Sequence, residues 1–283
     1  MSKEIVFIHS GLGNQMFQYA FYLAKKHNNP NTRCNMGLLK NRKVHNGFEL
    51  EKIFGIKIPN YHFHTFLLRV MYYSKLIEKI LKTIGIKEIT DRSYHSNNNK
   101  ALVKYFSGYW QTEQHFSHIK KEIRKAFQFP VERLNDESQE IAKMITHCNS
   151  ISIHIRRGDY TRPQFVGIYG NICTLDYYVK AINKSMESVD NPTYFVFSDD
   201  IDWVKQNLKI PNPIYVNCNK GNDSWQDMYL MSICKHNITA NSTFSWWGAW
   251  LNANPDKKVF CPPLFDNVNA SPNIFPEHWI KIH

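Results

Sequence analysis

The sequence predicts an α/β protein of two lobes with a cleft between them, and three observations lead to this expectation. With 283 residues, the chain is long for one compact domain and sufficient for two. Hydrophobic residues form 43% and charged residues 21% of the chain, which is typical of a globular protein with a substantial core. From Ser150 onward, short apolar segments alternate with helical patterns, which predicts a parallel sheet covered by helices on both faces.

The N-terminal half begins with a strand, a glycine turn and a helix. Residues 4–8 are apolar and β-branched, residues 10–15 form the turn, and residues 16–26 repeat at helical spacing. The segment 28–60 is polar and irregular. A strand is expected at 105–110, and helices at 114–127 and 135–148. The pattern changes after the last helix, so we expect an N-terminal lobe at 1–148 and a C-terminal lobe at 149–283.

Regular βα alternation fills the C-terminal half. Ligands of such sheets bind beyond the carboxyl ends of the strands, where this chain places its unusual polar residues. The expected strands lie at 151–155, 193–197, 214–216, 237–240 and 258–261, and the expected helices at 175–187, 200–208, 224–234 and 244–252.

The positive charge of the chain narrows the choice of partners. Lys and Arg number 35 against 24 Asp and Glu, a formal net charge of +11, which attracts nucleotide phosphates, nucleic acid or an anionic membrane. No helix-turn-helix, RNP-like or zinc-finger pattern is present, so we expect no nucleic-acid partner. The six cysteines lack a CxxC pair and indicate reduced, buried thiols. Together with the absence of a secretory signal pattern, they predict a cytoplasmic protein.

One basic segment, 63–86, repeats apolar residues at helical spacing but is interrupted by Arg69, Lys75, Lys79 and Lys82, so it is no membrane span. It predicts a single amphipathic helix. The more common explanation of such a pattern is a helix packed on the core with a solvated basic face. The alternative is a patch that rests peripherally on an anionic membrane.

The strongest motif is His154-Ile155-Arg156-Arg157-Gly158-Asp159-Tyr160, directly after an apolar strand. Two arginines near a core are costly unless charged groups accompany them. A guanidinium presents a planar fork of donors that matches diphosphate oxygens and can neutralise a nucleotide leaving group. The alternative is a structural ion-pair network in which Asp159 neutralises one arginine.

The turn Gly11-Leu12-Gly13-Asn14-Gln15 supplies backbone N–H groups at a helix N-terminus, where phosphate binds readily. The third glycine of a GxGxxG fingerprint is absent, so an NAD-type site is not indicated. A plain tight turn is the alternative.

Two further strand ends carry polar residues. Asp199 and Asp200 follow an apolar strand, and either of them caps the next helix or accepts hydrogen bonds from N1 and the 2-amino group of guanine. The segment Asn241-Ser242-Thr243-Phe244-Ser245 places hydroxyls and backbone N–H groups where a strand turns into a helix, as a diphosphate site requires. The tryptophans that follow, 246, 247 and 250, are more typical of core than of a sugar platform.

Patterns for metal and nucleophile chemistry are lacking. The sequence has no DxD after an apolar strand, no HExxH and no GxSxG. We therefore expect no metal and no cofactor, with arginine taking the place of a cation.

The motifs GLGNQMFQYAFY, HIRRGDY, FSDD and ANSTFSWWGAWL together resemble family 11 glycosyltransferases, the bacterial and animal α-1,2-fucosyltransferases. The resemblance implies a GT-B architecture of two Rossmann-like lobes, with an acceptor-side N-terminal lobe and GDP-fucose held mainly by the C-terminal lobe. It implies guanine contacts from His154 and Asp199, and diphosphate contacts from Arg156 and Arg157. It also implies phosphate contacts from the turn residues Gly13 and Asn14, and from the segment Ser242, Thr243, Phe244 and Ser245.

The resemblance also implies the reaction, which inverts GDP-β-L-fucose to an α-1,2-fucoside on a galactose-containing glycan such as an O-antigen. Arg156 and Arg157 are the expected catalytic groups, and Asp159 is the candidate base, unless it only orients Arg157. The acceptor region, about 28–99, matches nothing alignable, so the acceptor stays open and a lipid-linked one is a hypothesis. A non-catalytic GDP-sugar or carbohydrate-binding module and a fucosyltransferase of polypeptide hydroxyls are the alternatives.

Overall fold

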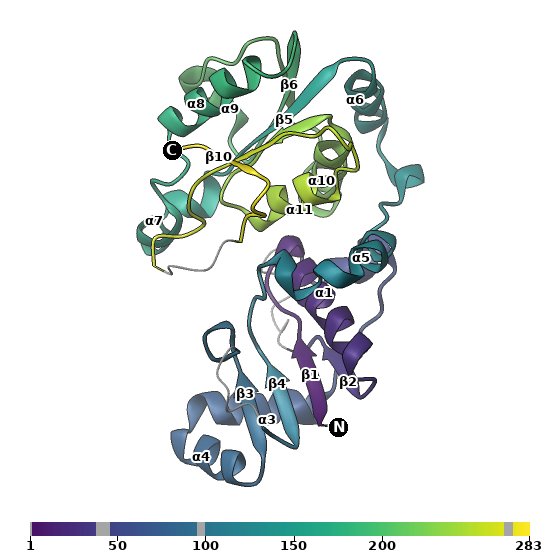
Figure 1. Cartoon of the computed structure of the whole chain (residues 1–283), viewed down its shortest axis with the longest axis vertical. Coiled ribbons are helices and arrows are strands. Elements are labelled where there is room, and N and C mark those ends of the chain that lie inside the picture. The colour runs from purple at the N-terminus through teal and green to yellow at the C-terminus, as the bar shows by residue number, and fades with distance from the viewer. Residues whose placement is uncertain (1, 38–45, 95–99, 269–273) are drawn as a thin grey trace. The chain divides into compact units, whose positions relative to one another are not determined.

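The computed structural model describes residues 2–37, 46–94, 100–268 and 274–283 (Figure 1). It divides into two compact units, Met1–Phe129 and Pro130–His283. Each unit is built on a parallel sheet, as the sequence predicts.

The N-terminal unit contains a four-stranded parallel sheet in the order β2-β1-β4-β3. An aromatic cluster fills part of its core, where Phe21 stacks on Trp110 with ring centroids 4.1 Å apart. The elements of the unit are β1 (Lys3–Phe7), α1 (Leu12–Asn28), β2 (Thr32–Asn35), α2 (Glu49–Phe54), α3 (His62–Tyr73), α4 (Lys75–Thr83), β3 (Ile86–Ile89), β4 (Val103–Phe106) and α5 (Lys120–Ala126).

Three elements of this unit, β2, β3 and α2, were not expected from the sequence. The two strands are the edges of the sheet and only four residues long, and β3 has two adjacent charged residues between its isoleucines. Such short edge strands lack the continuous apolar run of a central strand. The helix expected at 114–127 is wrong in extent, because only its end is α-helical, as α5, after two 3₁₀ turns.

The prediction of a single helix at 63–86 is also wrong, because the helix is interrupted at Ser74. Ser74 has an extended backbone, and its hydroxyl accepts a hydrogen bond from the Ile77 N–H at 3.4 Å, which caps α4. Helix α3 packs Thr65, Leu68 and Met71 into the unit. Helix α4, in contrast, has no buried residue. Packing on the core therefore applies to one face of α3, whereas α4 contributes Leu81, which is half-buried, to the same core cluster.

The C-terminal unit contains a six-stranded parallel sheet in the order β10-β9-β8-β5-β6-β7. All five predicted strands and all four predicted helices are present, with β10 and α7 in addition. The elements are α6 (Asp136–Thr146), β5 (Asn149–Ile155), α7 (Pro163–Tyr169), α8 (Leu175–Met186), β6 (Pro192–Ser198), α9 (Ile201–Asn207), β7 (Pro213–Val216), α10 (Trp225–Ile233), β8 (His236–Ile238), α11 (Thr243–Leu251), β9 (Val259–Cys261) and β10 (Ile280–Lys281).

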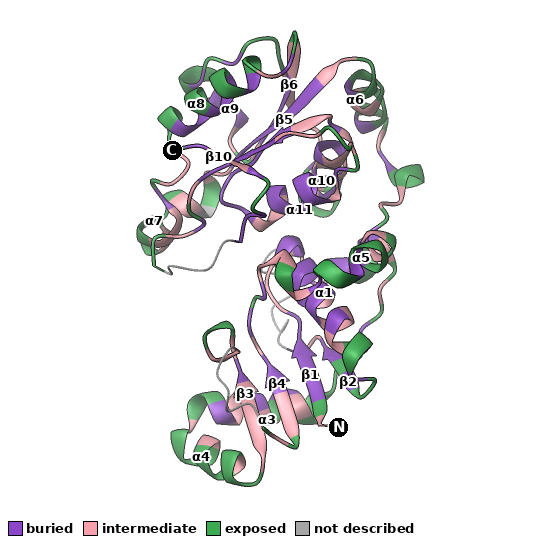
Figure 2. Ribbon diagram, viewed as in Figure 1, coloured by how far each residue is buried: buried purple, intermediate pink, exposed green. Residues whose placement is uncertain are grey.

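The central strands of this sheet are largely buried (Figure 2), and their side chains alternate between two cores. Tyr194 and Val196 of β6 join the core formed with α8 and α9, whereas Phe195 and Phe197 join the core formed with α6 and α10. Successive strand residues point to opposite faces, so the continuous apolar run of β6 reflects burial on both sides.

The boundary between the units lies before α6, earlier than the expected division at 148 and 149. Helix α6 belongs to the C-terminal unit because its N-cap is tied to α10. The Asn135 N–H donates to Gln226 Oε1 at 3.0 Å, and the Asn135 side chain donates to Asn219 Oδ1 at 2.8 Å. Ile145 then joins the core with Phe195.

Helix α11 is anchored by its aromatic residues, which are buried as the sequence predicts: Trp246, Trp247 and Trp250. The Trp246 indole N–H donates to the Ile274 carbonyl at 2.8 Å. A buried amide ladder fixes the other end of the helix, because Asn252 donates to Asn237 Oδ1 at 2.8 Å and Asn237 donates to Ser152 Oγ at 2.7 Å.

None of the six cysteines forms a disulfide; three are buried and three half-buried. Among the described residues, no helix combines the length and apolar character that crossing a bilayer requires.

A half-buried carboxyl of α10, that of Asp227, makes stability depend on pH. Burial raises the pKa of Asp227 from 3.8 to about 7, although Asn219 donates to its Oδ1 at 2.8 Å. The stability contributed by the neutral form is complete below about pH 4 and is lost as the pH rises through about 7. We expect Asp227→Asn, which keeps the acceptor for Asn219, to stabilise the protein at about pH 8 more than at about pH 5.

Urea unfolding of both proteins at the two pH values measures this difference. An equal effect of the substitution at both values would contradict it.

Candidate active site

Three polar segments lie at the carboxyl ends of neighbouring strands in the C-terminal unit. Strand β5 pairs with β6 on one side and with β8 on the other. The sheet continues from β6 to β7 in one direction and from β8 to β9 and β10 in the other. The segments that follow these strands carry Arg156, Asp199 and Ser242. This is a topological switch point, the place where open parallel sheets bind ligands.

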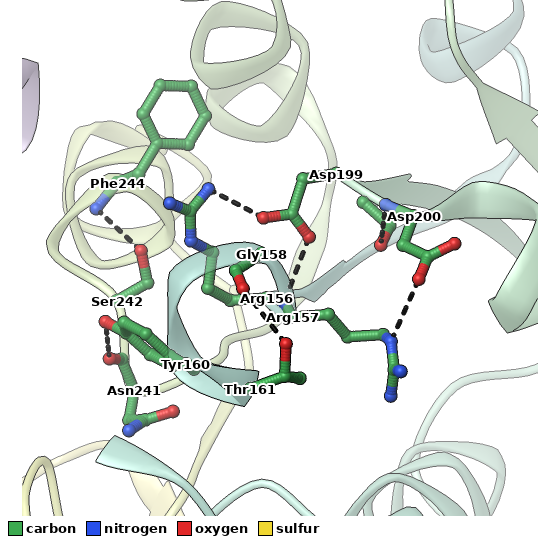
Figure 3. Close-up of polar contacts among 11 residues, drawn as sticks. Arg156, Arg157, Gly158, Tyr160, Thr161, Asp199, Asp200, Asn241, Ser242 and Phe244 are labelled. Atoms are coloured by element: carbon green, nitrogen blue, oxygen red, sulfur yellow. Dashed lines mark hydrogen bonds and ion pairs between the residues drawn. The ribbon is translucent and has the colours of Figure 1, made fainter. Parts of the chain in front are cut away.

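Arg156 is held between β6 and the start of α11. Its Nη1 lies 2.8 Å from Asp199 Oδ2, and its guanidinium carbon lies 5.8 Å from the centroid of the Tyr160 ring (Figure 3). The Tyr160 hydroxyl donates to the Asn241 carbonyl at 2.9 Å. The guanidinium is thus placed beside the turn that leads into α11.

Arg157, the next residue, has three contacts, all with residues that follow β6. Its backbone N–H donates to Asp199 Oδ1 at 2.9 Å, and its Nε donates to Asp200 Oδ2 at 3.1 Å. Its guanidinium carbon lies 3.6 Å from the centre of the Trp203 ring, close enough for a cation–π contact. Trp203 was not identified from the sequence, because it resembles an ordinary apolar residue of α9.

The aspartates have different tasks. Asp200 caps α9, since its Oδ1 accepts from the Trp203 N–H at 3.2 Å. Asp199 instead uses both carboxylate oxygens on the arginine motif. A Cβ on Gly158 would lie 2.5 Å from Asp199 Oδ2, so only glycine fits there without moving the carboxylate.

The ion-pair network around the arginines therefore exists, but its observed acids are Asp199 and Asp200. The side chain of Asp159, the expected acid and candidate base, lies outside the described residues. Where the structure describes the chain, no three His, Cys, Asp or Glu side chains form a group that could hold a metal ion.

His154, the last residue but one of β5, is a buried neutral histidine. Burial and, to a smaller extent, the charge of Arg156 lower its pKa to about 3. Its ring lies 5.9 Å from that of Phe244, and among the residues that the structure describes its Nδ1 has no hydrogen-bond partner. Buried polar atoms are usually paired, so this nitrogen is suited to a contact from a ligand.

The start of α11 combines a capped N-terminus with a rigid turn. Ser242 Oγ accepts from the Phe244 N–H at 3.3 Å, and Ser245 Oγ accepts from the Ala240 N–H at 3.2 Å. Thr243, the first residue of the helix, is half-buried. Asn241 holds the turn by donating to the Tyr169 and Phe265 carbonyls, both at 3.0 Å. The sequence-based site did not include Asn241, although it stands within the motif.

Gly13 and Asn14 belong to the N-terminal unit, in the first turn of α1 after β1. Gly13 is buried, and Asn14 Oδ1 accepts from Gln111 Nε2 at 2.7 Å. The next residue, Gln15, holds the turn because its side chain donates to the Ser10 and Gly47 carbonyls, both at 2.8 Å. The glycine turn thus forms at the carboxyl end of a parallel strand, as predicted.

Solved structures of similar fold support the architecture. The NodZ α-1,6-fucosyltransferase of Bradyrhizobium, soaked with GDP-fucose, matches with a TM-score of 0.51 and 13% sequence identity, over 89% of this chain and 93% of that one. Arabidopsis thaliana FUT1 in complex with GDP matches with a TM-score of 0.51 and 12% identity, over 92% of this chain and 70% of that one. Two α/β units with parallel sheets and these likenesses confirm the predicted GT-B fold.

Two sequence relatives match nearly the whole chain, and a third matches about half of it. An α-1,2-colitosyltransferase of Escherichia coli is 35% identical over 100% of this chain and 99% of the relative. The O-antigen biosynthesis glycosyltransferase WbnK of Escherichia coli is 30% identical over 96% and 98%. A galactoside α-(1,2)-fucosyltransferase of Ateles belzebuth is 27% identical over 48% and 39%. The family model described as glycosyl transferase family 11 matches residues 4–283, so the chain belongs to this family of glycosyltransferases, as the sequence motifs predict.

Proposed function

We propose that this glycosyltransferase transfers L-fucose from GDP-β-L-fucose to O-2 of a galactoside in a cell-surface glycan, with inversion to an α-1,2 linkage. The observation that carries the proposal is the placement of Arg156 and Arg157 at the switch point beside the start of α11. Two guanidiniums and a helix N-terminus are the groups that a diphosphate needs. The α-1,2 linkage in the names of two relatives supports the same reaction.

In this mechanism the bond between the anomeric carbon and the diphosphate oxygen breaks, and GDP leaves with the electron pair. The acceptor oxygen bonds to the anomeric carbon from the opposite face, and its proton passes to a base, for which we propose Asp159. Arg156 and Arg157 stabilise the charge that develops on the leaving diphosphate. Each guanidinium has five N–H donors, so a carboxylate partner does not exhaust its capacity.

Guanine recognition is proposed for His154 and Asp199. The neutral imidazole offers Nδ1, and a carboxylate accepts from guanine N1–H and the 2-amino group together. Asp199 contacts both arginines of the motif, so a purine bound there would be linked directly to the diphosphate-binding groups. Ser242, Thr243, Phe244 and Ser245 would supply the phosphate-binding turn of the C-terminal unit. A phosphate contact from Gly13 and Asn14 stays a prediction from the sequence.

The identity of the transferred sugar has a second candidate. The relative that is 35% identical over the full length is an α-1,2-colitosyltransferase. Colitose is L-fucose without the 3-hydroxyl, so the same diphosphate site suits either donor and a hydrogen bond to O-3 would distinguish them. Offering both activated sugars at equal concentration decides between the candidates by the ratio of products.

The acceptor is proposed to be a galactose-containing O-antigen intermediate attached to a lipid carrier. The enzyme is proposed to act on it in the cytoplasm. The O-antigen relative of full length supports this choice of acceptor. A binding module without catalysis is disfavoured by full-length similarity to transferases. Transfer to a polypeptide hydroxyl is disfavoured because the names of two relatives specify an α-1,2 linkage, and one of these names specifies a galactoside as the acceptor.

Donor consumption tests the proposal most directly. We expect the protein to release GDP from GDP-fucose in the presence of EDTA and a galactose-terminated oligosaccharide, because arginine rather than a metal neutralises the leaving group. Chromatography of GDP and linkage analysis of the product measure the reaction. GDP binding without release with any acceptor would favour the binding module, and loss of turnover in EDTA would contradict metal independence.

Arginine substitution tests the catalytic assignment. We expect Arg157→Ala to lower kcat by about 100- to 1,000-fold, the range for removing one preorganised donor to a developing anion. Arg157→Lys keeps the charge but loses the fork and should recover only part of this loss. Arg162→Ala serves as the matched control, because it removes the same charge from an exposed residue, the N-cap of α7. A similar loss in both alanine variants would argue against a specific role.

Asp199→Asn tests guanine recognition. The wild type should bind GDP more tightly than inosine diphosphate, which lacks the 2-amino group, whereas the variant should lose most of this preference. Calorimetric titration of both nucleotides measures the ratio. Equal weakening for both nucleotides would show that Asp199 acts only by positioning the arginines.

A further inference from the structure

An exposed apolar surface covers α3 and α4 of the N-terminal unit. Large apolar side chains of these helices and of the residue that follows are between 53% and 83% exposed: Phe63, Phe66, Tyr73, Leu76, Ile80 and Ile84. Tyr72 is exposed as well, and Leu102, also exposed, lies against Gly85 at the end of α4. Figure 2 shows α4 exposed along most of its length. Contiguous exposed apolar surface of this kind marks an interaction site.

The apolar side chains follow helical spacing on the outer faces of the two helices. Residues 63, 66 and 73 lie on one side of α3, opposite Thr65, Leu68 and Met71, which pack inward. Leu76 and Ile80 of α4 and Ile84, the residue that caps its C-terminus, recur every four residues and form a second stripe. The chain therefore maintains a periodic apolar face that its own fold leaves uncovered.

Basic residues accompany this face. Between 61 and 87 the chain has five basic residues and one acidic residue, Glu78: the basic ones are Arg69, Lys75, Lys79, Lys82 and Lys87. Lys75, Lys79 and Lys82 recur at spacings of four and three on the side of α4 away from the leucine and isoleucines. Glu78 pairs with Lys82 at 2.6 Å and with Lys75 at 3.3 Å, which keeps the lysines on that side.

We propose that α3 and α4 form a peripheral docking surface for bilayers that contain anionic phospholipid. A basic polar face with aromatic and aliphatic residues opposite is the pattern of a helix that lies in the membrane interface. Phe63, Phe66 and Tyr73 are suited to the boundary between head groups and acyl chains. The net positive charge of the segment favours an anionic membrane over a protein partner without charge complementarity, and over a second copy of this chain, which carries the same positive charge.

The docking surface is independent of the transfer reaction, because none of its residues belongs to the proposed donor site. It also adds to the proposed function: a membrane-bound chain would meet a lipid-linked acceptor in two dimensions. Failure of either proposal leaves the other intact, since vesicle binding and GDP binding are measured separately.

Vesicle flotation of the full chain tests the proposal. The wild type should bind vesicles of phosphatidylcholine with phosphatidylglycerol, and bind vesicles of phosphatidylcholine alone far more weakly. Replacing Lys75, Lys79 and Lys82 together by Gln should weaken binding by on the order of 100-fold, since each lysine near an anionic membrane surface contributes about fivefold to the affinity. The matched control replaces three exposed, ion-paired lysines of the C-terminal unit by Gln: Lys143, Lys180 and Lys184.

The apolar stripe has its own variant and control. Phe66→Ser with Ile80→Ser should weaken binding by about tenfold or more, because two large apolar groups no longer enter the interface. Val179→Ser with Met186→Ser, at two exposed apolar positions of α8, should leave binding unchanged. Unaltered GDP affinity and thermal midpoint confirm that each variant is folded.

Three results would overturn the proposal. Binding that does not depend on phosphatidylglycerol would remove the role of charge. Equal vesicle binding by the α3–α4 variants and their controls would remove the role of this surface. A wild-type dimer that Phe66→Ser with Ile80→Ser dissociates, without vesicle binding, would assign the surface to a second copy; light scattering on the same samples detects it.

Discussion

The candidate site depends on the compensation of two adjacent positive charges at the end of one strand. Arg156 and Arg157 follow the buried strand β5, and without acids beside them their desolvation would oppose the fold. Asp199 bridges the Arg156 guanidinium and the Arg157 backbone, while Asp200 divides its carboxylate between Arg157 and the N-terminus of α9. The arginines are therefore oriented by the same groups that end β6 and begin the next helix. A diphosphate would meet guanidiniums that are already placed, which lowers the reorganisation that catalysis requires.

The sheet supplies the second half of this arrangement through β8 and α11. Because α11 begins only a few residues after β8, its N-terminus must lie next to the arginine turn on β5. The helix is fixed at its far end by the ladder from Asn252 through Asn237 to Ser152, all buried and hydrogen-bonded. A fully satisfied polar network of this kind specifies one packing. The start of α11, which belongs to the candidate site, is thus positioned by buried polar contacts within the unit and not by the loops alone.

Sequence patterns predict the central strands of the C-terminal unit and the places where polar residues follow them. They do not predict which strands are neighbours, and the pairing of Arg156 with Asp199 depends on the register that sets Ile155 opposite Ser198. The sequence does not predict a role for Trp203, because that role depends on the contact of the Arg157 guanidinium with its ring. In the N-terminal unit, β2 and β3 are too short and polar to show an apolar period. The break at Ser74 involves neither proline nor glycine, so helical spacing continues across it and predicts one helix instead of two.

Helix α4 departs from the agreement between local pattern and burial that governs the rest of the chain. Nine residues are fewer than an isolated helix needs for stability in water, and tertiary burial normally makes up the difference. Here no residue is fully buried: Leu81 packs half-buried against the core, and the Ser74 cap and the ion pairs of Glu78 are added to that contact. Such surface pairs contribute little. A membrane interface would supply the missing apolar burial, so helix stability and docking would be linked: lipid binding would stabilise α4, and α4 would in turn order the face that binds. Departures of this kind from internal consistency are expected where a surface serves a function.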